Sequence, residues 1–129
     1  MKHFLKFMSL CLLMAILLTA CGGKRVNVTE DQNGQTITLN KGNTLSISIA
    51  GNITTGYTWE VAEVDENILV SAGEPDYKTE SDLVGGGGVF IFKFSAENAG
   101  STPLKLKYYR SFEPDVDPIQ TFEINVIVD

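Results

Sequence analysis

Histidine and cysteine are nearly absent from this chain, which has one histidine and two cysteines in 129 residues. His3 and Cys11 both lie in the first 20 residues, which we expect to be removed as an export signal. Cys21 would then be the last cysteine, and no histidine would remain. The composition therefore excludes nucleophilic catalysis by Ser–His or Cys–His pairs, zinc sites built from histidine and cysteine, and an internal disulfide.

The export signal is predicted from two basic residues followed by an apolar run. Lys2 and Lys6 come first, and the run 7–18 is too short for an ordinary membrane span. The run ends in Leu18-Thr19-Ala20-Cys21, which resembles the bacterial lipobox, the motif whose cysteine receives lipid. Plain secretion with a free thiol is the alternative.

These features divide the chain into three parts. We expect residues 1–20 to be a lipoprotein signal peptide, residues 21–34 a lipidated cysteine with a tether, and residues 35–129 a single folded domain. The protein would then be exported and anchored to the bacterial cell envelope. Its contact with a membrane would be made by the lipid on Cys21.

Basic residues are scarce. Without Lys2 and Lys6 the chain keeps eight lysines and arginines against 16 acidic residues, a net charge of −8. This charge argues against nucleic acid as a partner, because its phosphates require a basic patch. The same charge disfavours electrostatic docking on anionic lipid. We expect the domain to be a monomer.

Helical periodicity is missing after the signal, and alternation with a period of two recurs instead. The alternating runs contain Val26 and Val28; Ile37 and Leu39; Leu45, Ile47 and Ile49; Trp59 and Val61; Ile68 to Val70; Val89 to Phe94; Leu104, Leu106 and Tyr108; and Phe122 to Val128. Seven or so short strands predict an all-β, immunoglobulin-like β-sandwich, with a small barrel as the alternative. The run 89–94 is apolar on both faces and predicts a central strand covered on both sides.

Three unusual loops interrupt this strand pattern. The first is Asn52-Ile53-Thr54-Thr55-Gly56-Tyr57. Gly56 is expected to take a positive φ, and asparagine and glycine close turns without needing a partner. In a functional interpretation Thr54 and Thr55 stand at the tip, where hydroxyls and backbone amides can meet another protein.

The second loop is Gly85-Gly86-Gly87-Gly88, directly before a strongly hydrophobic strand. A wide loop or a bulge is its purely structural interpretation. In the functional one, bare backbone lies against the surface of a partner. A phosphate-binding role is disfavoured because a strand follows where a helix would be required.

The third loop is Tyr109-Arg110-Ser111-Phe112-Glu113-Pro114. Arg110 fits a surface cation paired with a carboxylate, and Phe112 fits either the core or an exposed anchor. Aromatic residues and arginine are also the types enriched in interface hot spots. Glu113, Asp115 and Asp117 alternate as at the start of a calcium loop, but Pro118 stands where a glycine is required. No metal ion and no cofactor is expected.

Taken in order, the three loops resemble the chagasin family of proteins that inhibit papain-like cysteine peptidases. The family pattern is roughly Asn-Pro-Thr-Thr-Gly-Tyr/Phe, then a glycine-rich loop, then Arg-Pro-Trp/Phe. The resemblance covers Thr36 to Asp129 and implies an immunoglobulin-like fold with the three loops at one end. There they would form a wedge that reversibly plugs the catalytic cleft of a papain-like cysteine peptidase, so the protein would not be an enzyme.

The resemblance also implies which residues bind the peptidase. Thr54 and Thr55 would lie at the catalytic cysteine and histidine of the target, with the other two loops on the two sides of the cleft. The implied binding residues are Asn52, Thr54, Thr55, Gly56, Tyr57, Gly85, Gly86, Gly87, Gly88, Arg110 and Phe112.

The chain departs from the family pattern at two positions. Ile53 and Ser111 stand where the family usually has proline, and each lost proline is expected to loosen its loop by about 0.4–1 kcal/mol. The alternative function is an immunoglobulin-like adhesion or assembly module of the envelope, which would use strand edges or the acidic stretch 113–117.

Overall fold

The computed structural model describes residues 23–80 and 85–129, which form strands and two short 3₁₀ helices, η1 (Glu30–Gln32) and η2 (Ile53–Thr55). The predicted signal peptide and Cys21 lie outside the described residues. The strands are β1 (Arg25–Thr29), β2 (Thr36–Leu39), β3 (Thr44–Gly51), β4 (Tyr57–Glu63), β5 (Leu69–Ser71), β6 (Asp76–Thr79), β7 (Gly88–Ala96), β8 (Gly100–Arg110) and β9 (Gln120–Val128).

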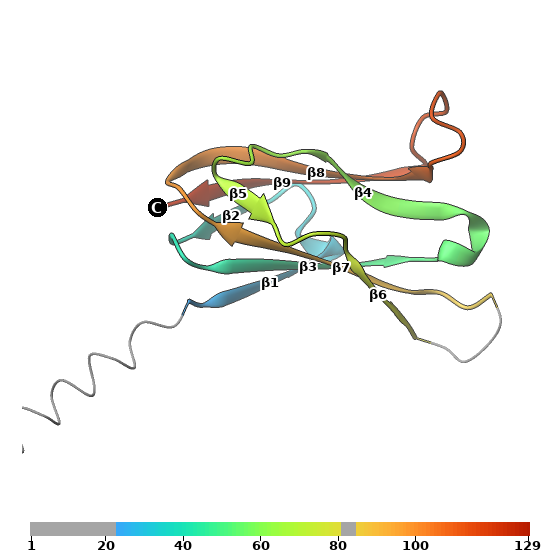
Figure 1. The fold of residues 1–129 in the computed structure, drawn as a ribbon, viewed down its shortest axis with the longest axis horizontal. Coiled ribbons are helices and arrows are strands. Elements are labelled where there is room, and N and C mark those ends of the chain that lie inside the picture. The colour runs from blue at the N-terminus through green and yellow to red at the C-terminus, as the bar shows by residue number, and fades with distance from the viewer. Residues whose placement is uncertain (1–22, 81–84) are drawn as a thin grey trace, which may run out of the picture.

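The strands form two sheets that pack face to face (Figure 1). One sheet has the order β1-β3-β7-β5, with β6 also paired to β7, and the other has the order β2-β9-β8-β4. β1 runs parallel to β3 and β2 parallel to β9, whereas the other pairs are antiparallel. The chain therefore adds an edge strand to one sheet, turns through η1, and adds an edge strand to the other.

The core lies between the sheets and is built from alternate residues of the strands. Phe90, Phe92 and Phe94 of β7 are buried, while the residues between them are half-buried. Trp59 of β4 is the largest fully buried side chain, and its indole N–H donates to the carbonyl of Ala50 at 2.9 Å. Burying a large apolar side chain stabilises a fold by about 1.5–3 kcal/mol, and the hydrogen bond satisfies the one polar atom of the indole.

The predicted all-β, immunoglobulin-like sandwich is confirmed, with nine strands in the described residues instead of seven or so. The sequence pattern does not predict β6, because Tyr77 is its only large apolar residue. The prediction that the run 89–94 is covered on both sides is wrong. Its phenylalanines face the core, whereas Val89 and Ile91 are half-buried on the outer face of the sheet.

The folded domain begins earlier than predicted. Val28 is buried in the core, and every residue of β1 is paired with β3. Just before β1, the carbonyl of Lys24 accepts a hydrogen bond from the amide of Thr44 at 2.9 Å. Residues 24–32 therefore belong to the sandwich and not to the tether expected over residues 21–34.

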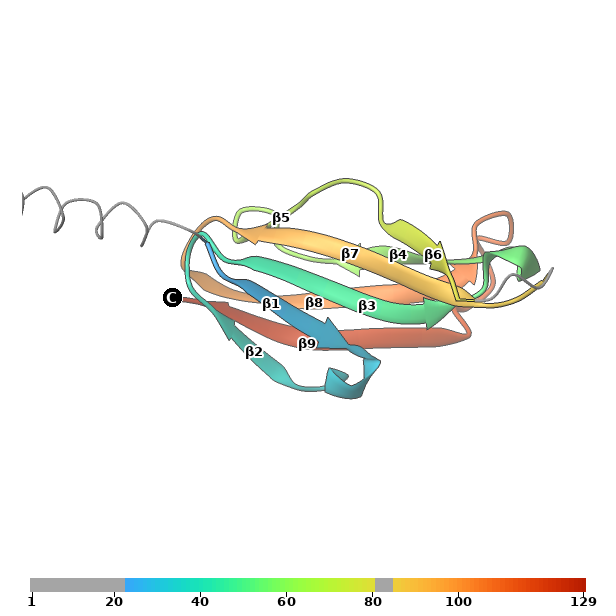
Figure 2. The same ribbon diagram turned by 90° about the horizontal axis from the view of Figure 1, so that it is seen from below.

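The two ends of the sandwich differ in what they carry. The β3–β4 and β8–β9 connections and the start of β7 lie together at one end, on the right in Figures 1 and 2, and β1 begins at the other end, where the C-terminus also lies. Within residues 23–80 and 85–129, no helix has the length and apolar character needed to cross a membrane.

Candidate functional site

The three loops singled out in the sequence meet at one end of the sandwich. They are the first loop (residues 52–56), the second loop (described over residues 85–87) and the third loop (residues 111–119). The side-chain amide of Asn52 donates to the carbonyl of Gly85 at 3.0 Å, which links the first loop to the second. Nε of Arg110 donates to the carbonyl of Thr55 at 3.3 Å, which links the first loop to the start of the third. The loops therefore form one connected surface.

The first loop is a single 3₁₀ turn closed by its own polar groups. Oδ1 of Asn52 accepts from the amide of Thr54 at 3.0 Å and from the Thr54 hydroxyl at 2.6 Å. The Thr55 hydroxyl donates to the carbonyl of Asn52 at 2.7 Å. Gly56 ends the turn with a φ of 85°, as the sequence predicts.

Thr54 and Thr55 are exposed at the tip, as predicted. Their hydroxyl hydrogens, however, donate inward to Asn52, so the hydroxyls can only accept hydrogen bonds from a partner. These inward bonds also explain how the turn is held with Ile53 in place of proline. The stiffness comes from hydrogen bonds made by Asn52 and not from a restricted φ.

The base of the first loop is fixed by a tyrosine hydroxyl from the neighbouring sheet. The amide of Asn52 donates to the Tyr108 hydroxyl at 2.9 Å, and that hydroxyl lies 3.2 Å from the Asn52 carbonyl, to which it donates. The Tyr108 ring stacks on Trp59, with ring centroids 5.0 Å apart. The loop is thus tied to the buried aromatic core, which does not move readily.

The third loop starts with an arginine held between aromatic rings. The guanidinium of Arg110 lies 4.5 Å from the ring centre of Tyr57 and 5.9 Å from that of Phe112. Nη1 of Arg110 is also 3.7 Å from a carboxylate oxygen of Glu113. The pairing with a carboxylate that the sequence suggested is present, but the same side chain also joins two of the loops.

Phe112 is exposed and is not a core residue, with 68% of its surface accessible. Its ring lies over Gly56, where an added β-carbon would be 3.1 Å from two ring atoms. Gly56 is therefore required twice, once for its positive φ and once for the space that the ring occupies. This contact places the exposed aromatic ring directly beside the tip of the first loop.

The second loop includes only part of the glycine run. Gly85 is exposed with a φ of 82°, and Gly86 and Gly87 follow it into the strand. Gly88 is already the first residue of β7 and is buried, so the prediction that it contacts a partner is wrong. A β-carbon on Gly88 would lie 2.5 Å from the ring of Tyr77, which shows that this glycine makes room for that ring.

Charged side chains near the loop end lie on the outer face of β4 and β8. The Tyr109 hydroxyl donates to a carboxylate oxygen of Glu60 at 2.5 Å, and this hydrogen bond raises the pKa of Tyr109. Nζ of Lys107 lies 4.2 Å from the centre of the Tyr109 ring. In the described part of the chain, no group of three or more acidic, histidine or cysteine residues is arranged to hold a metal ion.

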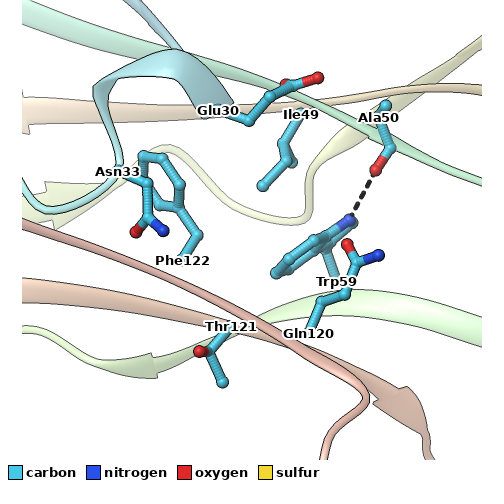
Figure 3. Close-up of a pocket in the computed structure, with 8 residues that line it drawn as sticks. All are labelled: Glu30, Asn33, Ile49, Ala50, Trp59, Gln120, Thr121 and Phe122. Carbon is cyan, nitrogen blue, oxygen red and sulfur yellow. Dashed lines mark hydrogen bonds between the residues drawn. The ribbon is translucent and has the colours of Figure 1, made fainter.

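A hollow of about 320 Å³ lies between η1, β3, β4 and β9 (Figure 3). It is lined by Glu30, Asn33, Ile49, Ala50, Trp59, Gln120, Thr121 and Phe122. Glu30 is the only acidic residue in this lining, so the hollow lacks the paired carboxylates of a glycosidase and any other acid–base pair. It offers no chemistry that competes with the loop end as the functional site.

Sequence reasoning missed the residues that hold the loops. Tyr108 is predicted only as a core position of its strand, and Tyr77 lies in the strand that the pattern does not mark. The Tyr77 hydroxyl lies 3.4 Å from the carbonyl of Gly51, at the start of the first loop. No local signal could reveal these contacts, because they join residues 26 and 56 positions apart.

The chain belongs to the chagasin family, since the model of the Chagasin family peptidase inhibitor I42 matches residues 38–126. The match spans the first loop, the second loop and the whole of the third loop. Because the family consists of peptidase inhibitors, the chain is not an enzyme.

Similar proteins are found in both sequence and structure. Amoebiasin-1 of Entamoeba histolytica is 31% identical over 102 residues, which cover 78% of this chain and 99% of that protein. The crystal structure of a cysteine protease inhibitor from Entamoeba histolytica gives a TM-score of 0.74 at 22% identity and covers 82% of this chain and 96% of that one. The structure of PbICP-C in complex with falcipain-2 gives a TM-score of 0.57 at 23% identity, and the match covers 83% of this chain and 100% of that one. The two structures share the fold of this chain.

Proposed function

We propose that this protein is a reversible inhibitor of papain-like cysteine peptidases and that its three-loop end occupies the active-site cleft. The observation that carries the proposal is the direct bonding of the three loops, from Asn52 to Gly85 and from Arg110 to Thr55. Family membership supports the same function. Under this proposal the peptidase-binding residues are Asn52, Thr54, Thr55, Gly56, Tyr57, Gly85, Gly86, Gly87, Arg110 and Phe112.

The physical reason for tight binding is that the three-loop end is already ordered and loses little conformational entropy when it docks. The tip residues Thr54 and Thr55 are held by bonds to Asn52, so binding does not have to order them. A tight 3₁₀ turn also holds the backbone away from the extended form in which a peptidase attacks a peptide bond. Under this proposal the chain does no chemistry on the peptidase, and inhibition is reversible occlusion of the cleft.

The distribution of apolar surface favours the same end of the molecule. Five large hydrophobic side chains are exposed in the described residues, and four of them, Ile53, Phe112, Val116 and Ile119, lie on the first and third loops. Exposed apolar side chains gathered in one place, beside an arginine, are typical of a protein-binding surface.

The test is titration of active-site-titrated papain with the soluble domain, residues 23–129. We expect stoichiometric inhibition, and we expect Thr54→Val with Thr55→Val to weaken it, because valine keeps the shape of threonine but removes the bonds to Asn52. Thr36→Val with Thr38→Val is the matched control, since both threonines are exposed on β2, which pairs with the C-terminal half of β9. A domain that folds but does not inhibit papain or a cathepsin L-type peptidase at micromolar concentration contradicts the proposal.

We also propose that the protein is anchored to the bacterial cell envelope by lipid on Cys21. The support comes from the sequence, namely the apolar run and the motif Leu18-Thr19-Ala20-Cys21. The expected measurement is a mass increase on Cys21 of the processed protein that corresponds to a lipid modification. A processed protein with a free thiol would support plain secretion instead.

A further inference from the structure

The third loop carries more exposed apolar surface than the predicted binding motif uses. Phe112 is accounted for by its contact with Gly56, but Val116 is 58% exposed and Ile119 is 55% exposed further along the same loop. Elsewhere in the described residues, Val70 of β5 is the only large hydrophobic side chain exposed outside the first and third loops, at 42%.

The loop from Arg110 to Ile119 is ordered by backbone hydrogen bonds. The amide of Glu113 donates to the carbonyl of Arg110 at 3.0 Å, and the amide of Val116 donates to the carbonyl of Glu113 at 3.2 Å, which makes two successive turns. At its base, the amide of Ile119 donates to the carbonyl of Tyr108 at 3.0 Å. Pro114 and Pro118 further restrict the backbone. Val116 and Ile119 are therefore presented without a large entropic cost on binding.

Only one of the three carboxylates in this segment lies beside a cation. Glu113 lies beside Arg110, but Asp115 and Asp117 form no ion pair with any cation of the described residues, and both are exposed. An exposed carboxylate on each side of Val116 suits a partner surface that offers lysine or arginine around an apolar patch.

The direction of the segment separates it from the tip of the first loop. In Figure 1 the β8–β9 connection leaves the body of the sandwich sideways, whereas the β3–β4 connection continues along the strands. A partner that receives the first loop in a groove would therefore meet the far part of the third loop outside that groove.

We propose that Val116 and Ile119, with Asp115 and Asp117, form a second contact with the target peptidase, on the wall beside its cleft. We call these four residues the side arm. This inference rests on the proposed function. The side arm recognises an apolar patch bordered by basic side chains, so it selects among peptidases that share the same cleft but differ on that wall.

The test compares variants on a panel of papain-like peptidases whose cleft walls differ in charge and apolar character. For peptidases with a basic, apolar wall, we expect Val116→Ser with Ile119→Ser to raise the inhibition constant about tenfold. Peptidases with an acidic wall should show little change. Val70→Ser is the matched control, because it removes an exposed valine at the far end of β7 and should leave every inhibition constant unchanged.

A charge variant tests the second half of the inference. Asp115→Asn with Asp117→Asn should lower the association rate constant for peptidases with a basic wall and make that rate constant less dependent on salt concentration. The dissociation rate constant should change less. Inhibition by both side-arm variants that equals that of the wild type across the whole panel would overturn the inference while leaving the proposed function intact. A folded wild-type domain that inhibits no member of the panel would overturn the proposed function, and the side arm with it.

Discussion

The hydroxyl of Tyr108 bonds to both backbone polar groups of Asn52, accepting from its amide at 2.9 Å and donating to its carbonyl at 3.2 Å. The two residues are 56 positions apart: Asn52 directly follows β3 of one sheet, and Tyr108 lies in β8 of the other. One buried side chain therefore holds the first residue of the tip loop at a fixed place above the core. Because Asn52 in turn bonds Thr54, Thr55 and Gly85, the position of two loops depends on this contact.

Removing the hydroxyl alone should loosen the loop end without opening the core. Tyr108→Phe keeps the ring that stacks on Trp59 but leaves the half-buried amide of Asn52 without its partner, and we expect a loss of about 1–2 kcal/mol in the free energy of unfolding. Inhibition should weaken about tenfold, because the loops must then be ordered on binding. Urea denaturation and the inhibition constant of papain measure the two effects.

The adjacent tyrosine supplies the control for this variant. Tyr109→Phe removes a hydroxyl of the same kind, but one that donates to the exposed Glu60 on the outer face of the sheet. We expect it to change stability by no more than about 0.5 kcal/mol and to leave inhibition unchanged. Equal losses of inhibition in the two variants would show that the contact with Asn52 has no special role.

Gly56 allows a prediction that separates backbone strain from a lost contact. Gly56→Ala places a side chain at a φ of 85° and a β-carbon 3.1 Å from the ring of Phe112. Gly34→Ala meets the same strain at a φ of 83°, with nothing within 4 Å of the new β-carbon. Both should lose about 1–2 kcal/mol of stability. Only Gly56→Ala should weaken inhibition. Thermal unfolding measures the stability of the two variants, and titration of papain measures their inhibition. Weaker inhibition by Gly34→Ala as well would mean that the effect comes from general instability.

The loops could be found from the sequence because their signals are local. A glycine that must take a positive φ, as at position 56, shows itself in the turn chemistry of its neighbours. The strands with clean alternation, such as 45–49 and 104–108, were predictable for the same reason. The clustering of the loops was expected from a family resemblance, since no spacing in the sequence dictates it.

Other features depend on contacts that the sequence does not display. β6 has a single large apolar residue, Tyr77, and becomes a strand because β7 offers it a free edge. Gly88 looks like a loop glycine, but it is buried under the Tyr77 ring. Before residue 35 the alternation is limited to Val26 and Val28, which is too little to exclude a tether, and the pairing of β1 with β3 and the burial of Val28 assign the segment to the domain.

Asn52 should couple the first loop to the second through its side-chain amide. Asn52→Asp keeps an oxygen that can accept from Thr54, but it loses the donor to Gly85 and turns a carboxylate toward that carbonyl. We expect faster hydrogen exchange of the amides at residues 85–87, weaker inhibition, and a loss of about 1 kcal/mol in stability.

The opposite end of the sandwich offers a matched variant. The side-chain amide of Asn98 donates to the carbonyl of Asn67 at 2.7 Å, a bond of the same type in an exposed place. Asn98→Asp should therefore cost a similar amount of stability while the inhibition constant stays the same. Unchanged exchange at residues 85–87 in Asn52→Asp would mean that the second loop keeps its position without this bond.

The proposed lipid anchor makes a prediction about orientation. A β-carbon on Gly23 would lie 2.3 Å from the carbonyl oxygen of Gly42, so the chain is held against the β2–β3 turn from Gly23 onward. Cys21 is two residues earlier, and two residues of extended chain span at most about 7 Å. The loop end is separated from this turn by the length of β8, whose 11 residues extend about 36 Å. The lipid would thus hold the turn near the membrane and point the three loops away from it.

Fluorescence measures this orientation directly. Lys41→Cys and Ser111→Cys place a single label on the β2–β3 turn or on the third loop of the lipidated protein, in vesicles that carry an acceptor dye on their headgroups. Energy transfer should be strong from position 41 and weak from position 111, and absent from both in the soluble domain, residues 23–129. Vesicle-bound protein should still titrate soluble papain, because the cleft of an enzyme in solution can reach loops that face away from the bilayer. Equal transfer from the two positions in acylated protein would mean that the domain lies flat on the membrane, with its inhibitory edge turned toward the lipid.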